Sequence, residues 1–324
     1  MNIKNKKARM PLVSVIIPSF NHELFISDAI NSVFDQTYNN IELIVVDDGS
    51  KDSSLSILSK IKNSKFTLLR QKNRGAHAAI NRGIKEAKGK FLAILNSDDL
   101  FHKDRIRLLV ESFDKDTLLV CSWLEVIDSD DKILGVKQGW KNLLPWNPRK
   151  PEKLKNRFFK EKNNNFKSNL FFSNFISTTS NIIFKKKLIK HIGYFKNLRF
   201  AHDWDFFLRA SLFGKCKLVP KPLVSYRIHN SNTISSDKKM MTLEICIIYA
   251  YFMRKVSIES SVSKNLLFLE EYFSYYNLQD NYELILALVL LFNSKRKKDV
   301  IATYEDVLSN KKLLEYFVNK VKIK

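Results

Sequence analysis

The sequence predicts an α/β protein with a mostly parallel central sheet, followed by a C-terminal helical module. Short apolar, β-branched segments alternate with segments of helical periodicity up to residue 126. Two of the apolar segments end directly in acidic clusters. After residue 237 the alternation stops, and apolar residues recur only at helical spacing. These observations define the fold class and indicate where a site would lie.

The alternating elements occupy the first part of the chain. The predicted strands are 12–17, 41–46, 66–69, 91–95 and 118–126, and the predicted helices are 24–34, 53–60, 76–87 and 103–113. Pro18 ends the first strand, and Gly89 suits the end of the third helix. Right-handed crossovers bring the carboxyl ends of parallel strands to one sheet edge, where ligands bind. Both acidic clusters should therefore lie at this edge.

The rest of the chain changes character twice. Residues 141–199 contain fifteen basic and two acidic residues, and we expect this stretch to cover the open side of the sheet. A helix at 202–213 and short strands at 217–219 and 223–227 are predicted next. Amphipathic helices are predicted at 241–256, 264–276, 282–293 and 301–312. The chain therefore divides into an α/β domain, 1–237, and a helical module, 238–324, which would contact a membrane surface or another subunit.

The composition points to an anionic partner in a reducing compartment. There are 55 Lys and Arg residues against 33 Asp and Glu in 324, a formal net charge of +22. The partner would be nucleic acid, a phosphate-bearing substrate or an acidic membrane, unless the charge reflects the bias of the source genome. The three cysteines fit neither a zinc site nor a disulfide framework. We find no signal-peptide pattern, and the apolar run 282–292 is too short to span a bilayer. We expect a cytoplasmic protein, free or peripheral on the inner face of the cell membrane.

Asp98 and Asp99 follow the fourth predicted strand, in Asn96-Ser97-Asp98-Asp99. Adjacent carboxylates at a strand end can hold Mn²⁺ or Mg²⁺ and leave positions open for phosphate oxygens. The alternative is that they only cap the following helix. A cation here would neutralise a diphosphate leaving group, so the pair indicates nucleotide diphosphate chemistry.

Asp47 and Asp48 follow the second strand, in Asp47-Asp48-Gly49-Ser50. One carboxylate can accept the N–H of a nucleobase such as uracil; the alternative is a strand-to-helix turn with acidic capping. Arg74 and His77 follow the third strand and are candidate phosphate contacts at the same edge.

Asp203 begins the helix predicted at 202–213. An acceptor hydroxyl loses a proton as it attacks, and a carboxylate within hydrogen-bond reach is the usual base. Asp203 is the candidate base, with Trp204 placed to shield the site or stack on a sugar; a plain helix cap is the alternative. His229 is a candidate metal ligand or phosphate donor, although a lone histidine is most often structural. The other histidines, His22 among them, show no metal-binding spacing.

Six blocks, in order over residues 12–230, resemble the family-2 glycosyltransferases, which have the GT-A fold. They are Val13-Ser14-Val15-Ile16-Ile17-Pro18-Ser19-Phe20-Asn21, Gln36-Thr37 with 41–50, Asn73-Arg74-Gly75 through Ala87-Lys88-Gly89, Asn96-Ser97-Asp98-Asp99, Asp203-Trp204-Asp205 with Arg209, and Tyr226-Arg227-Ile228-His229. The resemblance implies inverting, single-displacement transfer from a nucleotide diphosphate sugar, UDP-linked in our prediction. The acceptor would be a glycan or lipid-linked saccharide, as in bacterial surface polysaccharides.

The resemblance also implies a role for each matched residue. By this match Pro18, Asn21 and Asp48 would hold the base, Asp98 would contact the ribose or help bind the metal, Asp99 would ligate Mn²⁺ or Mg²⁺, and Asp203 would be the general base. Three positions depart from the family pattern. Asn96 replaces the usual first Asp, His202 stands where Glu usually precedes the catalytic Asp, and Ile80 where many members have Arg. The Gln-x-x-Arg-Trp run of processive polymerases is not found in the sequence, which favours addition of one or a few sugars.

Two other functions stay open at this point. The same fold without catalysis would be a sugar- or nucleotide-binding protein. The charge alone would favour a nucleic-acid or polyanion binder, but we recognise no such module, and the acidic edge would repel phosphates without a metal. We therefore expect a hexosyltransferase that does not bind nucleic acid.

Overall fold

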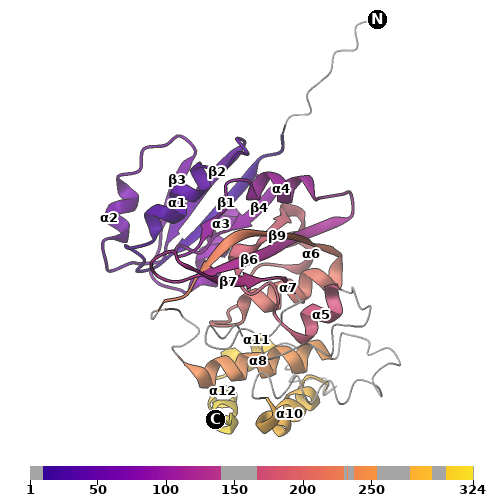
Figure 1. Ribbon diagram of the computed structural model, residues 1–324. Helices are drawn as coiled ribbons and strands as arrows, with labels where there is room; N and C mark the ends of the chain where they lie inside the picture. The colour runs from indigo at the N-terminus through magenta and orange to yellow at the C-terminus, as the bar shows by residue number, and fades with distance from the viewer. Residues whose placement is uncertain are drawn as a thin grey trace, which may run out of the picture.

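The computed structural model describes residues 10–139, 166–229, 232, 237–253, 278–293 and 304–323 of the chain. A central sheet is covered by helices on both faces, and a further layer of helices lies below it in Figure 1. None of the helices in these residues is long and apolar enough to cross a membrane.

The sheet is mixed but mostly parallel. Its strands in the described residues are β1 (Val13–Ser19), β2 (Ile41–Asp47), β3 (Phe66–Arg70), β4 (Phe91–Ile94), β5 (Leu100–Phe101), β6 (Thr117–Ile127), β7 (Ile133–Lys137), β8 (Ile182–Lys185) and β9 (Lys215–Arg227). They lie in the order β3-β2-β1-β4-β8-β6-β9-β5, with β7 beside β6. β3, β2, β1 and β4 are mutually parallel, β8 is antiparallel to both β4 and β6, and β9 is parallel to β6. The strands β1, β2, β3, β4, β6 and β9 therefore all point to the same edge.

Two hydrophobic cores flank the sheet. The helices are α1 (Ile26–Phe34), α2 (Ser54–Ser59), α3 (Ala76–Glu86), α4 (Arg105–Glu111), α5 (Phe166–Phe172), α6 (Ile189–Ile192), α7 (His202–Phe213), α8 (Lys238–Met253), α10 (Tyr282–Asn293), α11 (Tyr304–Ser309) and α12 (Lys311–Lys320). One core packs α1, α2 and α4 on the sheet. The other packs α3, α5 and α7 on the opposite face and continues into α8, α10 and α12. A boundary at 237/238 remains a prediction, and the core runs across it.

The structure corrects several predicted elements. The strands predicted at 217–219 and 223–227 are one strand, β9, whose register against β6 shifts at Ser122 and Trp123. The helix predicted at 301–312 is two helices, because Asn310 has extended backbone and its side chain caps α12 at Leu313. The helix predicted at 264–276, and residues 141–165 of the basic stretch, lie outside the described residues.

Candidate active site

Strand direction brings the acidic clusters to one edge of the sheet. β2 ends at Asp47, the loop after β4 carries Asp98 and Asp99, and β9 leads to His229. The phenol of Tyr226 is influenced by several of these groups. Its pKa is raised by burial and then by the charges of Asp99, Asp98 and Asp203. Carboxylates from the β4 loop and from α7 therefore act electrostatically on the same side chain.

Asp98 lies beside two imidazoles that contact each other. Its Oδ2 is 3.1 Å from His229 Nε2 and 4.0 Å from His22 Nε2. One ligand atom from each of the three residues falls within 4.8 Å of the others, a spacing that a single cation can bridge. Burial alone would raise the pKa of Asp98, but the hydrogen bond from His229 and the charge of His22 lower it. The carboxylate is therefore held ionised beside two ring nitrogens.

The Nδ1 atom of His22 fixes the direction of the ring, so that Nε2 points toward Asp98. Its Nδ1 lies 2.6 Å from Ser97 Oγ, in the loop that carries Asp98. A metal-binding histidine usually has its other nitrogen fixed by such a partner, which sets the tautomer and ring direction. Phe25 packs beside both imidazoles, with ring centroids 6.3 Å from His22 and 5.0 Å from His229. The two rings therefore have defined positions beside Asp98.

Asp99 is fully buried behind this cluster. Its Oδ2 accepts a hydrogen bond from Ser180 Oγ at 2.5 Å, and its Oδ1 accepts one from the Arg227 backbone N–H at 2.9 Å. Burial, followed by the neighbouring charge of Asp98, raises the pKa of Asp99 to about 8. A cation beside the pair would favour the ionised form of both. In this arrangement Asp98 faces the imidazoles and Asp99 anchors the turn.

Two buried arginines fix the Asp98–Asp99 turn from behind. Arg227 donates from Nε to the Asp98 carbonyl at 2.9 Å and pairs through Nη2 with Asp131 at 2.7 Å. Arg105 donates to the Ser180 carbonyl at 2.9 Å, and Ser180 in turn donates to Asp99. Burial lowers the pKa of Arg105 to about 9. Buried charges are costly unless they are hydrogen-bonded. The two arginines therefore favour the one conformation of the Asp98–Asp99 turn in which they have these partners.

Asp203 lies near the start of α7 and is held by neutral donors. Its Oδ2 accepts from Asn174 Nδ2 at 3.0 Å and its Oδ1 from the Trp204 backbone N–H at 2.6 Å. Burial raises the pKa of Asp203 to about 6, although both hydrogen bonds lower it. The nearby Asp205 is different, because it is fully buried and forms an ion pair with Arg209 at 2.5 Å. Of the two acids, Asp203 has the basicity that proton transfer needs.

The position of Trp204 does not support the predicted sugar contact. Its indole is 3% exposed, and Nε1 donates to the Leu170 carbonyl at 2.8 Å. One face meets the edge of Tyr249 from α8, at 5.4 Å between centroids. Trp204 follows Asp203 directly, so the helical turn that presents Asp203 directs the next side chain into the core.

Asp48 organises the loop after β3. Its Oδ1 accepts from Gln71 Nε2 at 2.7 Å and from the Arg74 backbone N–H at 2.9 Å, and its Oδ2 accepts from the Gly75 N–H at 2.8 Å. The loop passes so close to Gly49, at φ 80°, that an added Cβ would lie 3.0 Å from the Asn73 nitrogen. Asp48 therefore sets the shape of this wall of the site.

Asp47 has a buried oxygen without a partner. Its Oδ2 accepts from the Gly49 and Ser50 backbone N–H groups at 3.2 Å. Among the described residues, neither its Oδ1 nor the buried Ser19 Oγ has a hydrogen-bond partner. Ser19, which follows Pro18 in β1, is paired with Asp47 in β2. Unpaired buried polar atoms are costly, so they mark a place that a polar ligand would complete.

Asn21 and His77 complete the description of this sheet edge. Asn21, at φ 54°, accepts from the Lys51 N–H at 2.8 Å and so ties the β1 loop to the β2 loop. His77 has its pKa lowered to about 4 by burial and then by the charge of His202, while Asp48 acts in the opposite direction. His77 therefore lies within electrostatic reach of both Asp48 and the start of α7.

The structure thus gathers most of the predicted residues. Asp98 and His229 come together, Asp203 shares the Tyr226 environment with Asp98 and Asp99, and Asp47 and Asp48 lie along the same edge. Sequence reasoning missed His22, because its distance along the chain from His229 is unlike any metal motif. Its position could have revealed it, because His22 follows the end of β1 in the same way that Asp98 follows the end of β4.

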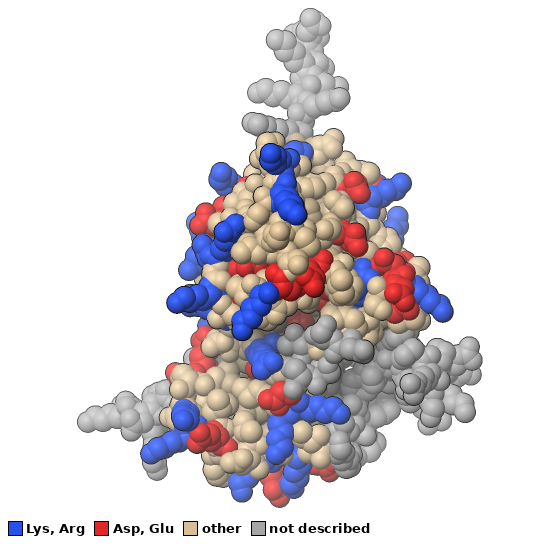
Figure 2. Space-filling model, turned by 90° about the vertical axis from the view of Figure 1, so that its left-hand side faces the viewer, with Lys and Arg blue, Asp and Glu red and all other residues tan. Residues whose placement is uncertain are grey.

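Figure 2 shows the charged side chains on one face of the molecule. Lys and Arg side chains are spread over much of this face, while acidic side chains gather across its middle. On this face the two signs of charge are therefore unevenly distributed.

The sheet order and the carboxylates at its edge define an enzyme of the GT-A glycosyltransferase class. Residues 14–193 match the family model described as glycosyl transferase family 2, so the chain belongs to this family and is a glycosyltransferase. Asp203 and His229 lie beyond the matched range. Their assignment therefore depends on the geometry above.

Curated relatives agree. An uncharacterized glycosyltransferase of Haemophilus influenzae is 30% identical over 280 residues, covering 81% of this chain and 80% of that protein. One from Rickettsia prowazekii is 30% identical over 257 residues, 78% of this chain and 74% of its own. Hyaluronan synthase of Pasteurella multocida is 28% identical over 242 residues, which is 72% of this chain but 22% of that enzyme.

Solved structures share the fold. S. aureus TarS 1–349 in complex with UDP-GlcNAc is 22% identical, with a TM-score of 0.62 over 95% of this chain and 88% of that one. A mannosyltransferase from Pyrobaculum calidifontis, in complex with GDP-Man and Mn²⁺, is 16% identical, with a TM-score of 0.56 over 96% and 84%. At these identities the likeness establishes the GT-A fold of this chain.

Proposed function

We propose that this chain transfers a sugar, with inversion and with the help of a divalent cation, from a UDP-linked donor to an acceptor hydroxyl. The observation that carries the proposal is a cluster of possible metal ligands together with a separate basic carboxylate, both of which contribute charge at Tyr226. The cluster is Asp98 with His22 and His229, and the carboxylate is Asp203, which has a raised pKa. A charge-neutralising site and a proton acceptor are the two parts that such a transfer needs.

The reaction is a single displacement at the anomeric carbon. The acceptor oxygen forms a bond to that carbon as the bond to the diphosphate oxygen breaks, and the electron pair leaves with the diphosphate. Attack from the face opposite the leaving group inverts the configuration. Asp203 accepts the hydroxyl proton; with a pKa of about 6 it is ionised at neutral pH yet more basic than an ordinary Asp.

The donor set fits a first-row transition cation such as Mn²⁺ better than Mg²⁺. His22, Asp98 and His229 offer two imidazole nitrogens and one carboxylate oxygen, whereas Mg²⁺ is best held by oxygen ligands. A cation bound there neutralises the charge that develops on the leaving diphosphate. Asp99, which the sequence had suggested as the chief ligand, would support this site by orienting the turn.

The nucleotide would lie over the ends of β1 and β2. The unpaired Oδ1 of Asp47 and Oγ of Ser19 can accept from, and donate to, the edge of a uracil ring. Pro18, Asn21 and the loop that Asp48 holds would enclose it, with Arg74 available to a phosphate. The identities of the nucleotide and of the sugar belong to this proposal.

The acceptor would be a glycan or lipid-linked saccharide at an anionic membrane surface. Support comes from the net charge of +22 and from α10, where Tyr282, Leu286 and Leu290 are exposed at helical spacing. An exposed apolar stripe on a chain with a large positive net charge suits binding in a membrane interface. The alternative occupant of this stripe is a second copy of the chain.

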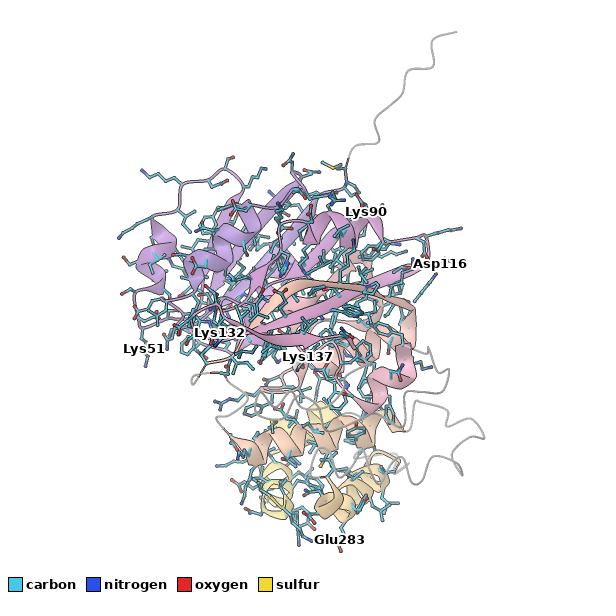
Figure 3. The ribbon with its side chains drawn as sticks, viewed as in Figure 1. Lys51, Lys90, Asp116, Lys132, Lys137 and Glu283 are labelled. Atoms are coloured by element: carbon cyan, nitrogen blue, oxygen red, sulfur yellow. The ribbon has the colours of Figure 1, made fainter. Side chains whose placement is uncertain are left out.

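The test is release of nucleotide diphosphate by the full-length protein from a panel of UDP-sugars with Mn²⁺ and acceptor saccharides. We expect Asp203→Asn to lower the rate by about 100-fold or more, because a positioned base contributes 10²–10⁴. Asp116→Asn is the matched control, since Asp116 is exposed at the far end of β6 (Figure 3). If Asp203→Asn keeps the wild-type rate, the base assignment is wrong. If no donor is turned over but UDP binds, the chain is a binding protein with a transferase fold.

A further inference from the structure

Glu244 of α8 is almost fully buried against the segment that leads into α7. Its side chain is 1% exposed. Its Oε1 accepts from the Arg199 backbone N–H at 2.8 Å, and its Oε2 accepts from those of Phe200 and Ala201 at 2.8 and 2.9 Å. These residues immediately precede α7, in which Asp203 is the second residue. One carboxylate from the C-terminal helices thus fixes the backbone just before the catalytic base.

The contact fixes the backbone just before the helix, where no side-chain cap is present. Ala201 is the N-cap residue of α7 and has no side chain that could accept a hydrogen bond. The backbone N–H groups at a helix start need acceptors, and a negative charge there is also favoured by the helix dipole. The carboxylate of Glu244 is costly to bury, and its three hydrogen bonds offset that cost. The path of residues 199–201 therefore depends on α8.

A second residue of α8 contacts the same region independently. The ring of Tyr249 packs edge-on against Trp204, with an interplanar angle of 90°. Its hydroxyl donates to the Phe171 carbonyl of α5 at 3.2 Å. The loop after α5 carries Asn174, the side chain that donates to Asp203. α8 thus touches both the segment that carries the base and the segment that carries its hydrogen-bond partner, and it lies directly beneath α7 in Figure 1.

We propose that α8 is a positioning element of the active site, in which Glu244 fixes residues 199–201 and thereby places Asp203 against the acceptor hydroxyl. The inference rests on the proposed role of Asp203 as general base. Glu244 does not touch the reacting atoms, so it is a positioning residue. The helix after residue 237 is then part of the catalytic unit and not only an attachment or assembly module.

The decisive variant is Glu244→Gln in the full-length protein. Glutamine keeps the size of the side chain but presents an NH₂ group where a backbone N–H now finds an acceptor. We expect the KM for the donor and the affinity for UDP with Mn²⁺ to stay within about twofold, while kcat falls about 10–100-fold, because displacement of a catalytic group by about 1 Å costs this much.

The pH profile gives a readout that loss of folded protein cannot imitate. Burial is the largest cause of the raised pKa of Asp203, and Asp205 and Tyr226 are the ionisable groups that interact with it from α7 and β9. Those two groups are unchanged in the variant. Loosening the start of α7 admits water to Asp203, so the acidic limb of kcat should move to lower pH.

Two further variants keep the test decisive. Glu283→Gln, on the exposed side of α10 at the bottom of the molecule in Figure 3, should behave as wild type. Tyr249→Phe removes one hydroxyl from the same contact surface and should lower kcat in the same direction by a smaller factor. If Glu244→Gln fails to fold, an unchanged kcat in Tyr249→Phe overturns the proposal.

The outcome separates this inference from the proposed function. If Asp203→Asn is inactive but Glu244→Gln has wild-type kcat and an unmoved acidic limb, the positioning role is wrong. A fall in activity that only follows the folded fraction, with the limb unmoved, also overturns it. If Asp203→Asn keeps its activity, the base assignment fails instead. In that case hydrogen exchange at the amides of residues 199–201 still tests the contact with Glu244. Exchange that is unchanged in Glu244→Gln would contradict the role of Glu244 in fixing this segment.

Discussion

At the scale of single residues, two aspartates at the start of α7 have opposite environments. Asp205 forms an ion pair with Arg209, whereas Asp203 accepts hydrogen bonds from the neutral donors of Asn174 and the Trp204 backbone. Burial raises the pKa of Asp203 to about 6 against these hydrogen bonds. A base with this pKa loses activity as the pH falls through 6, because its proton-accepting form disappears.

Asn174 controls where that loss occurs. Its Nδ2 hydrogen bond stabilises the ionised form of Asp203 and lowers its pKa. Asn174→Ala removes this donor, so the acidic limb of the kcat–pH profile should move to higher pH by about one unit. Initial-rate measurements between pH 5 and 8 check this, with the exposed Asn39→Ala as control. A limb that stays in place would mean that another group titrates.

His22 is the residue-scale test of the cation site. We expect wild-type protein to bind Mn²⁺ more tightly than Mg²⁺, because two of the three proposed ligands are imidazoles. His22→Ala should weaken Mn²⁺ binding about 10-fold or more while changing Mg²⁺ binding less. Calorimetric titration of each ion, with and without UDP, measures this directly. His191→Ala is the control, since His191 is exposed and stacks on Phe213. Equal losses for the two ions would argue against direct ligation by His22.

At the scale of elements, the packing of α3 on β1 admits only glycine at position 83. A Cβ there would lie 2.4 Å from Ile16 Cγ2. Helix propensity alone predicts that Gly83→Ala stabilises the protein by about 1 kcal/mol. Overpacking against a buried strand predicts the opposite sign, a loss of about 1–3 kcal/mol. Denaturant unfolding of the variant decides between them, and a higher midpoint than wild type would show that α3 can move away from β1.

The elements that sequence could predict are those with strong periodicity. β1, β2 and α3 appear close to their expected ends, because their apolar residues are local and continuous. β7 and β8 were missed. β7 is a short edge strand with little burial, and β8 lies in a stretch that reads as basic and irregular. β8 matters for the site, because Ser180, just before it, holds Asp99.

The site could be predicted as far as strand direction allowed. Parallel strands place Asp47 and Asp98 at one edge whatever the side chains do. Contacts between distant segments could not be inferred in the same way. The Ser97 contact that orients His22 and the Glu244 contact with 199–201 both depend on tertiary packing, which no local pattern records.

At the scale of the whole molecule, the helices after residue 237 have two distinct faces. α8 faces the catalytic core through Glu244 and Tyr249. α10 has the opposite character on its outer side, where Leu286 and Leu290 are 60% and 63% exposed. One face thus positions the base, and the other is available to a surface outside the chain.

We predict that the outer face of α10 binds reversibly to anionic membranes. Replacing both Leu286 and Leu290 with Gln should reduce the fraction of protein that floats with phosphatidylglycerol-containing vesicles at least fivefold, because burial of each leucine contributes about 1.5–3 kcal/mol. The exposed Ile133→Gln on β7 is the control. Activity on a soluble acceptor should stay unchanged, since α10 lies away from the sheet edge (Figure 1).

Equal recovery of wild type with neutral vesicles would contradict the electrostatic part of this prediction. If sedimentation shows a wild-type dimer that the double variant dissociates, the stripe joins two copies of the chain. The membrane must then be reached by another surface.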